Sequence, residues 1–265
     1  MNKTLRLALL STVALFAVAG APSHKALAAT LVGLTADNQL IRMDSETRRA
    51  MPATRITGTE GRVIAIDQRP ANGMLYGVTE RGQIVTLDPA TGRGTAVSRL
   101  SMPFEFGGRA VADFNPVPDR MRLMGMNGTN FRVNVETGEV VRDGTLKHGD
   151  GALAGTQPRI VAGAYINSMA GATATTLYTI DTLQNALNVQ APPNDGVQAP
   201  RARVSAQLPA GVAFDILAEG TTNTAFLLTG ATLHTLNLAD GVVATRGAVT
   251  GLPAAVEVID IAAMR

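Results

Sequence analysis

The sequence of 265 residues contains no cysteine and no tryptophan, and aromatic residues make up only 4% of it. Without cysteine no disulfide can staple the fold, so a hydrophobic core must hold it together. Hydrophobic residues make up 46% of the positions and charged residues 17%, a balance that excludes a disordered chain. The 27 glycines and 13 prolines follow no period of three, which excludes a collagen-like chain. The composition therefore indicates a globular protein of one or two domains.

The N-terminal region has the pattern of a secretory signal peptide. Basic residues precede an apolar stretch over residues 7–21, and the segment ends in Ala26-Leu27-Ala28, the small-x-small pattern that signal peptidase cleaves. The apolar stretch is shorter than the roughly 20 residues that a membrane-spanning helix needs, so a membrane anchor is the less favoured alternative. We expect residues 1–28 to be a signal peptide and residues 29–265 to form a single domain that is periplasmic or extracellular.

Removal of this segment changes the charge balance of the chain. The full sequence has 23 basic and 21 acidic residues, and three of the basic ones lie within residues 1–28. The exported domain therefore has 20 basic and 21 acidic residues and a net charge of −1. This balance gives no argument for nucleic-acid binding, and no later apolar stretch is long enough to span a bilayer. We expect a monomer, not inserted in the membrane after signal cleavage, whose partner is a small molecule, an envelope polymer or another protein.

A unit of two short strands recurs five times along the chain. In residues 75–92 apolar residues alternate on both sides of a Glu80-Arg81-Gly82 turn, and a second turn led by Asp88 closes the unit. The other copies occupy residues 31–47, 121–138, 177–196 and 225–241. Successive copies begin 44, 46, 56 and 48 residues apart, near the repeat length of β-propeller blades.

A second marker, an apolar strand that contains an aspartate, precedes the strand pair. It reads VIAID at 63–67, AVADF at 110–114, VAFDI at 212–216 and VIDI at 258–261. Ala164 stands where the remaining copy would carry the acid. The positions Asp67, Asp113, Ala164, Asp215 and Asp260 are separated by 46, 51, 51 and 45 residues. The two markers are therefore in phase.

The two ends of the chain complement each other. The copy at 31–47 lacks a preceding aspartate strand, and the aspartate strand at 258–261 has no strand pair after it. An open solenoid needs capping repeats at both ends, whereas a closed ring joins its last strand to its first blade. We therefore predict an all-β fold, a five-bladed β-propeller whose first blade is closed by N-terminal and C-terminal strands.

The remaining segments supply the outer strands of the blades. These strands are expected at residues 50–55, 94–97, 138–142, about 201–208, and 241–245. No segment after residue 28 shows a helical period. A β-sandwich is the alternative architecture, but it gives no reason for two markers in phase.

Three segments carry a more specific pattern. They are Ile66-Asp67-Gln68-Arg69-Pro70, Asp113-Phe114-Asn115-Pro116 followed by Asp119-Arg120-Met121-Arg122, and residues 172–178 continuing to Pro192-Pro193-Asn194-Asp195-Gly196. These segments resemble the domain of unknown function 4394 family, a family of secreted bacterial domains. The likeness covers roughly residues 31–262. It implies a propeller-like repeat fold and brings no activity that could be assigned to particular residues.

The aspartates of the second marker form the first candidate site. In a closed ring, Asp67, Asp113, Asp215 and Asp260 would lie at one height around the axis. One hypothesis is a metal site for Ca²⁺, which binds six to eight oxygen ligands. The alternative is structural, with each carboxylate accepting backbone N–H groups or pairing with an arginine of the neighbouring blade. The missing acid at Ala164 favours the structural alternative, and no cofactor other than Ca²⁺ is suggested.

The third unit contains the densest group of polar residues. Its candidate ligand-binding residues are Arg109, Asn115, Arg120, Arg122, Asn130 and Arg132. Alternation along a strand places Arg120 and Arg122 on the same face, where guanidinium groups could bind a carboxylate or phosphate. The same residues could instead form an ion-pair network between blades, with the asparagines in turns.

Catalytic motifs are scarce. His148 and His234 are the histidines that follow residue 28, and their spacing fits no metal-ligand motif. The sequence has no GxSxG, P-loop or GxGxxG pattern after a strand. We therefore expect an exported binding or scaffolding module of unknown ligand. The alternative is a secreted hydrolase of a carbohydrate or lactone that uses a pair of carboxylates at the mouth of the channel.

Overall fold

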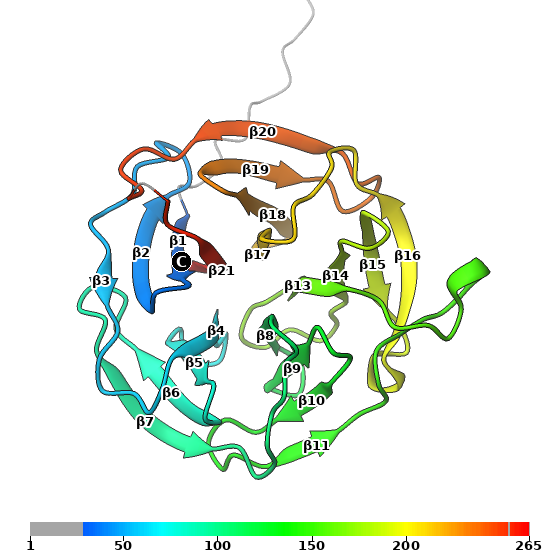
Figure 1. Ribbon diagram of the computed structural model, residues 1–265, viewed down its shortest axis with the longest axis horizontal. Coiled ribbons are helices and arrows are strands. Elements are labelled where there is room, and N and C mark those ends of the chain that lie inside the picture. The colour runs from blue at the N-terminus through cyan, green and yellow to red at the C-terminus, as the bar shows by residue number, and fades with distance from the viewer. Residues whose placement is uncertain (1–28, 254, 265) are drawn as a thin grey trace, which may run out of the picture.

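The computed structural model describes residues 29–253 and 255–264, which form five sheets arranged around a central axis (Figure 1). Counted outward from the axis, blade 1 contains β21 (Val258–Met264), β1 (Thr30–Thr35), β2 (Gln39–Asp44) and β3 (Thr54–Arg55). Blade 2 contains β4 (Val63–Gln68), β5 (Leu75–Thr79), β6 (Gln83–Leu87) and β7 (Gly94–Arg99). Blade 3 contains β8 (Ala110–Asn115), β9 (Arg120–Gly125), β10 (Asn130–Val133) and β11 (Val140–Arg142).

Blade 4 has a fifth strand. It contains β13 (Ile160–Tyr165), β14 (Leu177–Asp181), β15 (Ala186–Gln190), β16 (Val197–Arg203) and β12 (Lys147–His148). Blade 5 contains β17 (Ala213–Glu219), β18 (Thr222–Thr229), β19 (Thr232–Leu236) and β20 (Val243–Ala248). Two 3-10 turns, η1 (Gly151–Leu153) and η2 (Pro193–Asp195), complete the elements of the described chain. None of these elements is a helix that could cross a membrane, and the predicted signal peptide lies outside the described residues.

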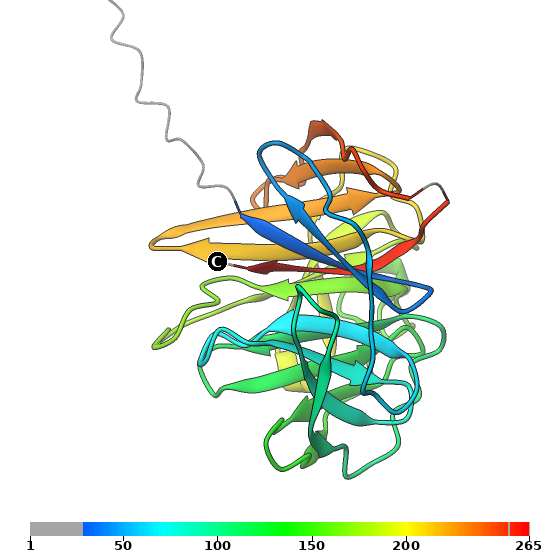
Figure 2. The same cartoon turned by 90° about the vertical axis from the view of Figure 1, so that its left-hand side faces the viewer.

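The ring is closed by the two ends of the chain. Strand β21 pairs antiparallel with β1, so that Leu31 faces Ala263 and Gly33 faces Ile261. Figure 2 shows the two strands side by side. The inner strands also pack around the full circle, β21 against β4, β4 against β8, β8 against β13, β13 against β17, and β17 against β21. The predicted five-bladed propeller with a shared first blade is confirmed, and a sandwich of two sheets is excluded.

The hydrophobic core lies between adjacent blades. Inner strands such as β4 and β8 are buried along nearly their whole length because a neighbouring blade covers each face, whereas the outer strand β7 is mostly exposed. Between blades 2 and 3, the ring of Tyr76 meets the ring of Phe114 edge to face, with centroids 5.4 Å apart. Burial of such side chains provides about 25 cal/mol per Å² of apolar surface, which replaces the disulfides that the sequence lacks.

The turns led by aspartate or asparagine are confirmed. Four of them begin at Asp44, Asp88, Asn134 and Asn237, where the side-chain oxygen accepts the N–H two residues later at 2.8–3.1 Å. The residue four positions later takes a positive φ, which is 78° at Gly138 and favours glycine. A Cβ at Gly138 would lie 1.8 Å from the carbonyl oxygen of Arg99, so this turn also requires glycine for its close approach to blade 2.

The outer strands lie near the expected segments, and those of two blades show the largest differences in bounds. Strand β3 is shorter than the predicted 50–55 segment, because Ala50 and Thr54–Arg55 pair with β2 while residues 51–53 between them are irregular. Strand β16 begins at Val197, before the predicted 201–208 segment, because its register is set by pairing with β15, in which Gln190 faces Gln198. Neither shift changes the order of the strands.

Candidate functional site

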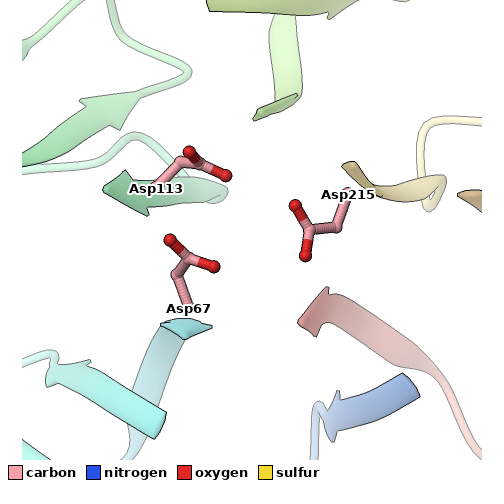
Figure 3. Close-up of side chains that lie close together, drawn as sticks. All are labelled: Asp67, Asp113 and Asp215. Carbon is pink, nitrogen blue, oxygen red and sulfur yellow. The ribbon is translucent and has the colours of Figure 1, made fainter. Parts of the chain in front are cut away.

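Three aspartates converge at the centre of the ring. Asp67 of β4, Asp113 of β8 and Asp215 of β17 turn their carboxyl groups toward one another (Figure 3). One oxygen from each lies within 4.8 Å of the other two, and the residues are 3–5% exposed. Asp260 of β21 is also buried, at 8% exposure. The structure therefore brings together three of the four acids that share a phase in the sequence, and buries the fourth in the same ring of inner strands.

Each of these carboxyl groups accepts a backbone N–H group from the next blade. The bonds run from Ile66 to Asp260 (2.9 Å), from Phe114 to Asp67 (2.6 Å), from Tyr165 to Asp113 (3.0 Å) and from Ala263 to Asp215 (2.5 Å). Four of the five junctions between neighbouring blades thus have a carboxyl bridge. The junction from blade 4 to blade 5 has none, because Ala164 carries no carboxyl group.

Burial raises the pKa of all four aspartates. It raises the pKa of Asp215 to about 6 and that of Asp260 to about 8. For Asp67 and Asp113, burial and then the charges of the neighbouring aspartates hold the pKa well above its usual range. Asp113 also shares a hydrogen bond with Asp215, which lowers the pKa of Asp215. The group can therefore retain protons near neutral pH.

The same group could hold a cation, but it supplies only part of a coordination shell. One oxygen from each of Asp67, Asp113 and Asp215 gives three ligands, against the six to eight oxygens that Ca²⁺ binds. The backbone N–H groups that already donate to these carboxyl groups account for their burial without a cation. The Ca²⁺ site stays a prediction.

Arg122, a candidate ligand-binding residue, is 2% exposed and bonded within the protein. Its Nη1 donates to Asn130 Oδ1 (2.9 Å) and Asp143 Oδ2 (2.6 Å), its Nη2 donates to Asn194 Oδ1 (3.1 Å), and its Nε donates to the Tyr165 hydroxyl (3.4 Å). Asn194 and Tyr165 belong to blade 4. Arg122 and Asn130 therefore join blade 3 to blade 4 and leave little hydrogen-bonding capacity for a ligand.

Three further candidates form hydrogen bonds or ion pairs with other residues of blade 3. Arg132 forms a two-pronged ion pair with Asp143, at 2.8 and 2.9 Å. Asn115 ends the inner strand β8, and its side chain accepts the N–H of Val117 in the following turn. Arg120 is exposed and donates to carbonyl groups of that same turn. The six candidates do not form one site, and Arg109 is the one at the start of an inner strand.

The residues that precede the five inner strands surround one mouth of the channel. They are Arg62, Arg109, Arg159, Val212 and Glu257. Between blades 1, 2 and 3 these positions border a cavity of about 190 Å³, lined among others by Arg62, Ile64, Phe106, Arg109, Glu257 and Ile259. The cavity therefore has three charged side chains on otherwise largely apolar walls.

Arg109 reaches across this mouth. Its Nη2 donates to the carbonyl oxygen of Val212 in blade 5 (2.9 Å), and its Nη1 lies 3.7 Å from Glu257 Oε1 in blade 1, too far for a hydrogen bond. Its Nε is buried and has no hydrogen-bond partner within the described part of the chain. Burial lowers the pKa of Arg109, while the charges of Asp260 and Glu257 raise it. The guanidinium is thus held at the cavity with most of its donors unused.

The segment before Arg109 fixes the position of this side chain. Gly107 and Gly108 both have positive φ, 64° and 106°, and a Cβ at Gly107 would lie 2.7 Å from the Cβ of Asn127. The N–H of Met126 donates to the carbonyl oxygens of Phe106 (2.8 Å) and Arg109 (3.0 Å). This double glycine lets the chain turn sharply against blade 3 and directs Arg109 to the mouth.

Sequence reasoning missed the partners of Arg109 at the cavity. Arg62 and Glu257 stand before the second marker in two other copies, as Arg109 does in its own. Their shared position in the repeat was a usable signal, because equal positions in a closed ring lie at the same end of the channel. Phe106 gave no such signal, since it lies in an irregular connection.

A solved structure shares this fold. The structure is similar to a structural genomics protein of unknown function from Bacteroides thetaiotaomicron VPI-5482, with a TM-score of 0.51, 16% identity, and coverage of 82% of this chain and 58% of that chain. A protein of unknown function from Bacteroides caccae gives a TM-score of 0.44 and 11% identity, with coverage of 80% of this chain and 69% of the other. The first likeness shows the fold alone.

The sequence itself gives a more specific match. No curated protein matches it. One family of domains, however, matches from the first described strand to the last, over residues 30–262. The protein therefore belongs to the family described as the domain of unknown function DUF4394.

Proposed function

We propose that the protein is an exported binding module that holds a small carboxylate-bearing ligand at the channel mouth, on the guanidinium of Arg109. The observation that carries this proposal is that the guanidinium is buried and most of its hydrogen-bond donors have no acceptor among the described residues. Its side chain is only 13% exposed, yet it makes one hydrogen bond of ordinary length among the described residues, to Val212. A buried cation with unused donors is costly unless a partner supplies acceptors. A carboxylate supplies two acceptor oxygens in the geometry of the guanidinium fork.

The cavity limits the size of the ligand. The volume of the cavity is about 190 Å³. Sites for drug-sized ligands are larger, about 300–1,000 Å³. The ligand is therefore a small metabolite or the end of a longer chain, with the rest of that chain outside the mouth.

Export of the protein is part of the same proposal. It rests on the charged, apolar and small-residue pattern of residues 1–28, and the absence of cysteine-dependent stabilisation is compatible with any compartment. A periplasmic or extracellular location would expose the mouth to small solutes of the envelope. Fractionation of cells that express the tagged full-length chain tests this part, and retention of the uncleaved chain in the cytoplasm would contradict it.

The hydrolase alternative receives less support from the geometry. Hydrolysis by paired carboxylates requires that a substrate can touch them. The channel aspartates are 3–8% exposed and accept backbone N–H groups, which suits a structural role better than attack on a substrate. We therefore place the ligand at the mouth and not on these acids.

Calorimetric titration with small carboxylates tests the proposed function. We expect acetate, propionate or isovalerate to bind, and the corresponding neutral amides to bind at least tenfold more weakly, because a charge-assisted hydrogen bond contributes about 1.5–3 kcal/mol. Arg109→Gln should remove the binding of the acids. Arg99→Gln is the matched control, since Arg99 is an exposed arginine that pairs with Glu60 away from the cavity. Equal binding of acids and amides, or binding unchanged in Arg109→Gln, would contradict the proposal.

A further inference from the structure

Resting on the proposed function, we infer that the ligand is a zwitterion: a small α-amino acid with an apolar side chain, its carboxylate on Arg109 and its ammonium group on Glu257. The inference depends on which charges of the cavity remain uncompensated, on the distance between them and on the nature of the remaining walls.

The charges of the cavity leave one cation and one anion for a ligand. Arg62 is compensated by Glu80, whose carboxylate accepts from the Arg62 side chain at 3.3 Å and from its backbone N–H at 3.1 Å. Arg109 and Glu257 remain, and at 3.7 Å they form a loose pair, since a charge-assisted bond closes to about 2.7–2.9 Å. A ligand with a net negative charge would bring its carboxylate beside that of Glu257. A ligand with an added ammonium group replaces this repulsion by attraction.

The spacing of the two charges suits an α-amino acid. In such a ligand the nitrogen and the carboxyl carbon are about 2.5 Å apart, from the N–Cα and Cα–C bond lengths and the angle between them. The charged atoms of Arg109 and Glu257 are 3.7 Å apart, so each can face its counterpart on the same small ligand. The two residues come from different blades, and their backbones are fixed independently. The carbonyl of Glu257 accepts the N–H of Ala36 at 2.9 Å, and that of Arg109 accepts the N–H of Met126 at 3.0 Å.

The two side chains differ in exposure in a way that fits this arrangement. The Arg109 side chain is 13% exposed and the Glu257 side chain is 61% exposed. A ligand carboxylate would therefore enter the deeper position, while the ammonium group stays near the rim, where Glu257 can adjust to it. The other walls include Ile64, Phe106 and Ile259. These side chains give an apolar surface for the ligand's side chain and no further polar group to bind there.

Matched pairs of ligands test this inference on the unmodified protein. Calorimetric titration compares L-alanine with propionate, L-valine with isovalerate, and L-leucine with 4-methylpentanoate. We expect at least one amino acid to bind tenfold or more tightly than its deaminated partner. If the deaminated acids bind as tightly as the amino acids or more tightly, the zwitterion is wrong while the carboxylate site on Arg109 stands. If neither series binds, both proposals fall.

Two variants test whether Glu257 causes the preference for amino acids over their deaminated partners. Glu257→Gln should reduce the ratio of the two affinities to about one, and should leave binding of the deaminated acid unchanged or stronger because a neighbouring negative charge is gone. Glu46→Gln is the matched control, since Glu46 pairs with Arg246 on the surface away from the cavity, and it should keep the full ratio. Circular dichroism melting of each variant verifies its fold. A preference that survives in a folded Glu257→Gln protein would overturn the assignment to Glu257.

Discussion

The buried aspartates of the channel should make the protein less stable as the pH rises. Asp260 shows the effect most simply, because burial raises its pKa from 3.8 to about 8. A group whose pKa is higher in the folded state keeps a proton that the unfolded chain releases. Its contribution to stability is therefore fully present below about pH 4 and is lost as the pH rises toward 8. Most globular proteins with paired carboxylates show the opposite slope in this range.

The magnitude follows from the size of the shift. Each pKa unit corresponds to about 1.4 kcal/mol, so the three units between the usual aspartate pKa and pH 7 correspond to about 4 kcal/mol for Asp260. Asp260→Asn removes this penalty but gives up one acceptor, since the carboxyl group accepts the N–H groups of Ile66 and Ile261 and an amide offers one oxygen. A lost acceptor for a buried N–H costs about 1–3 kcal/mol. We expect the variant to be about 2 kcal/mol more stable than the unmodified protein at pH 7 and about 2 kcal/mol less stable at pH 4.

Urea unfolding followed by circular dichroism measures how the free energies of unfolding of the unmodified protein and of Asp260→Asn change with pH. Unfolding midpoints would be recorded from pH 4 to pH 8.5 at constant ionic strength. Asp150→Asn is the control, because Asp150 is exposed and its side chain forms no hydrogen bond with the following turn. A wild-type protein that gains stability between pH 4 and pH 8, or an Asp260→Asn curve with the wild-type slope, would refute the reasoning.

Three other predictions concern the remaining features of the ring. Gly138→Ala should lower the free energy of unfolding by more than about 2 kcal/mol, since its Cβ would meet the backbone of blade 2 at 1.8 Å, whereas Gly155→Ala, with open space around it and the same sign of φ, should cost about 1 kcal/mol. Arg122→Gln should destabilise by about 3–5 kcal/mol because it leaves the buried Asp143 carboxylate with less compensation, whereas the exposed Arg120→Gln should change stability by less than about 0.5 kcal/mol, both measured by urea unfolding. If the channel aspartates hold Ca²⁺, the melting temperature should rise with added CaCl₂ and fall with chelator. Superimposable melting curves with and without chelator would remove the cation hypothesis.

The repeats made most of the fold predictable. Strand pairs, turns led by aspartate or asparagine, and a single aspartate strand per copy are local patterns, and each depends on a few neighbouring residues. The unmatched ends at residues 31–47 and 258–261 were enough to predict the pairing of β1 with β21, because strands that lack a partner in sequence must find one in space. The gathering of Asp67, Asp113 and Asp215 followed from the same reasoning.

Contacts across blades were not predictable in the same way. The sequence grouped Arg109 with Arg122 and Arg132 because they are close along the chain, but Arg122 and Arg132 share Asp143 whereas Arg109 donates to Val212 of another blade. The fifth strand β12 has two residues and no alternation, and its parallel pairing with β16 leaves no trace in the local sequence. Neither feature recurs from blade to blade, so the sequence repeats could not reveal it.

The repeats alone specify the number of blades, the closure of the ring and the height at which its aspartates lie, since a periodic chain repeats its local structure in each blade. Which charges are compensated depends instead on contacts between blades. Arg122 is bonded by residues of two blades, whereas Arg109 faces Val212 and Glu257 across the mouth and keeps unused donors. This difference arises because the partners of a buried charge include residues of other blades, Tyr165 and Asn194 for Arg122 and Val212 for Arg109, whose approach is set by the closed ring and not by spacing along the chain.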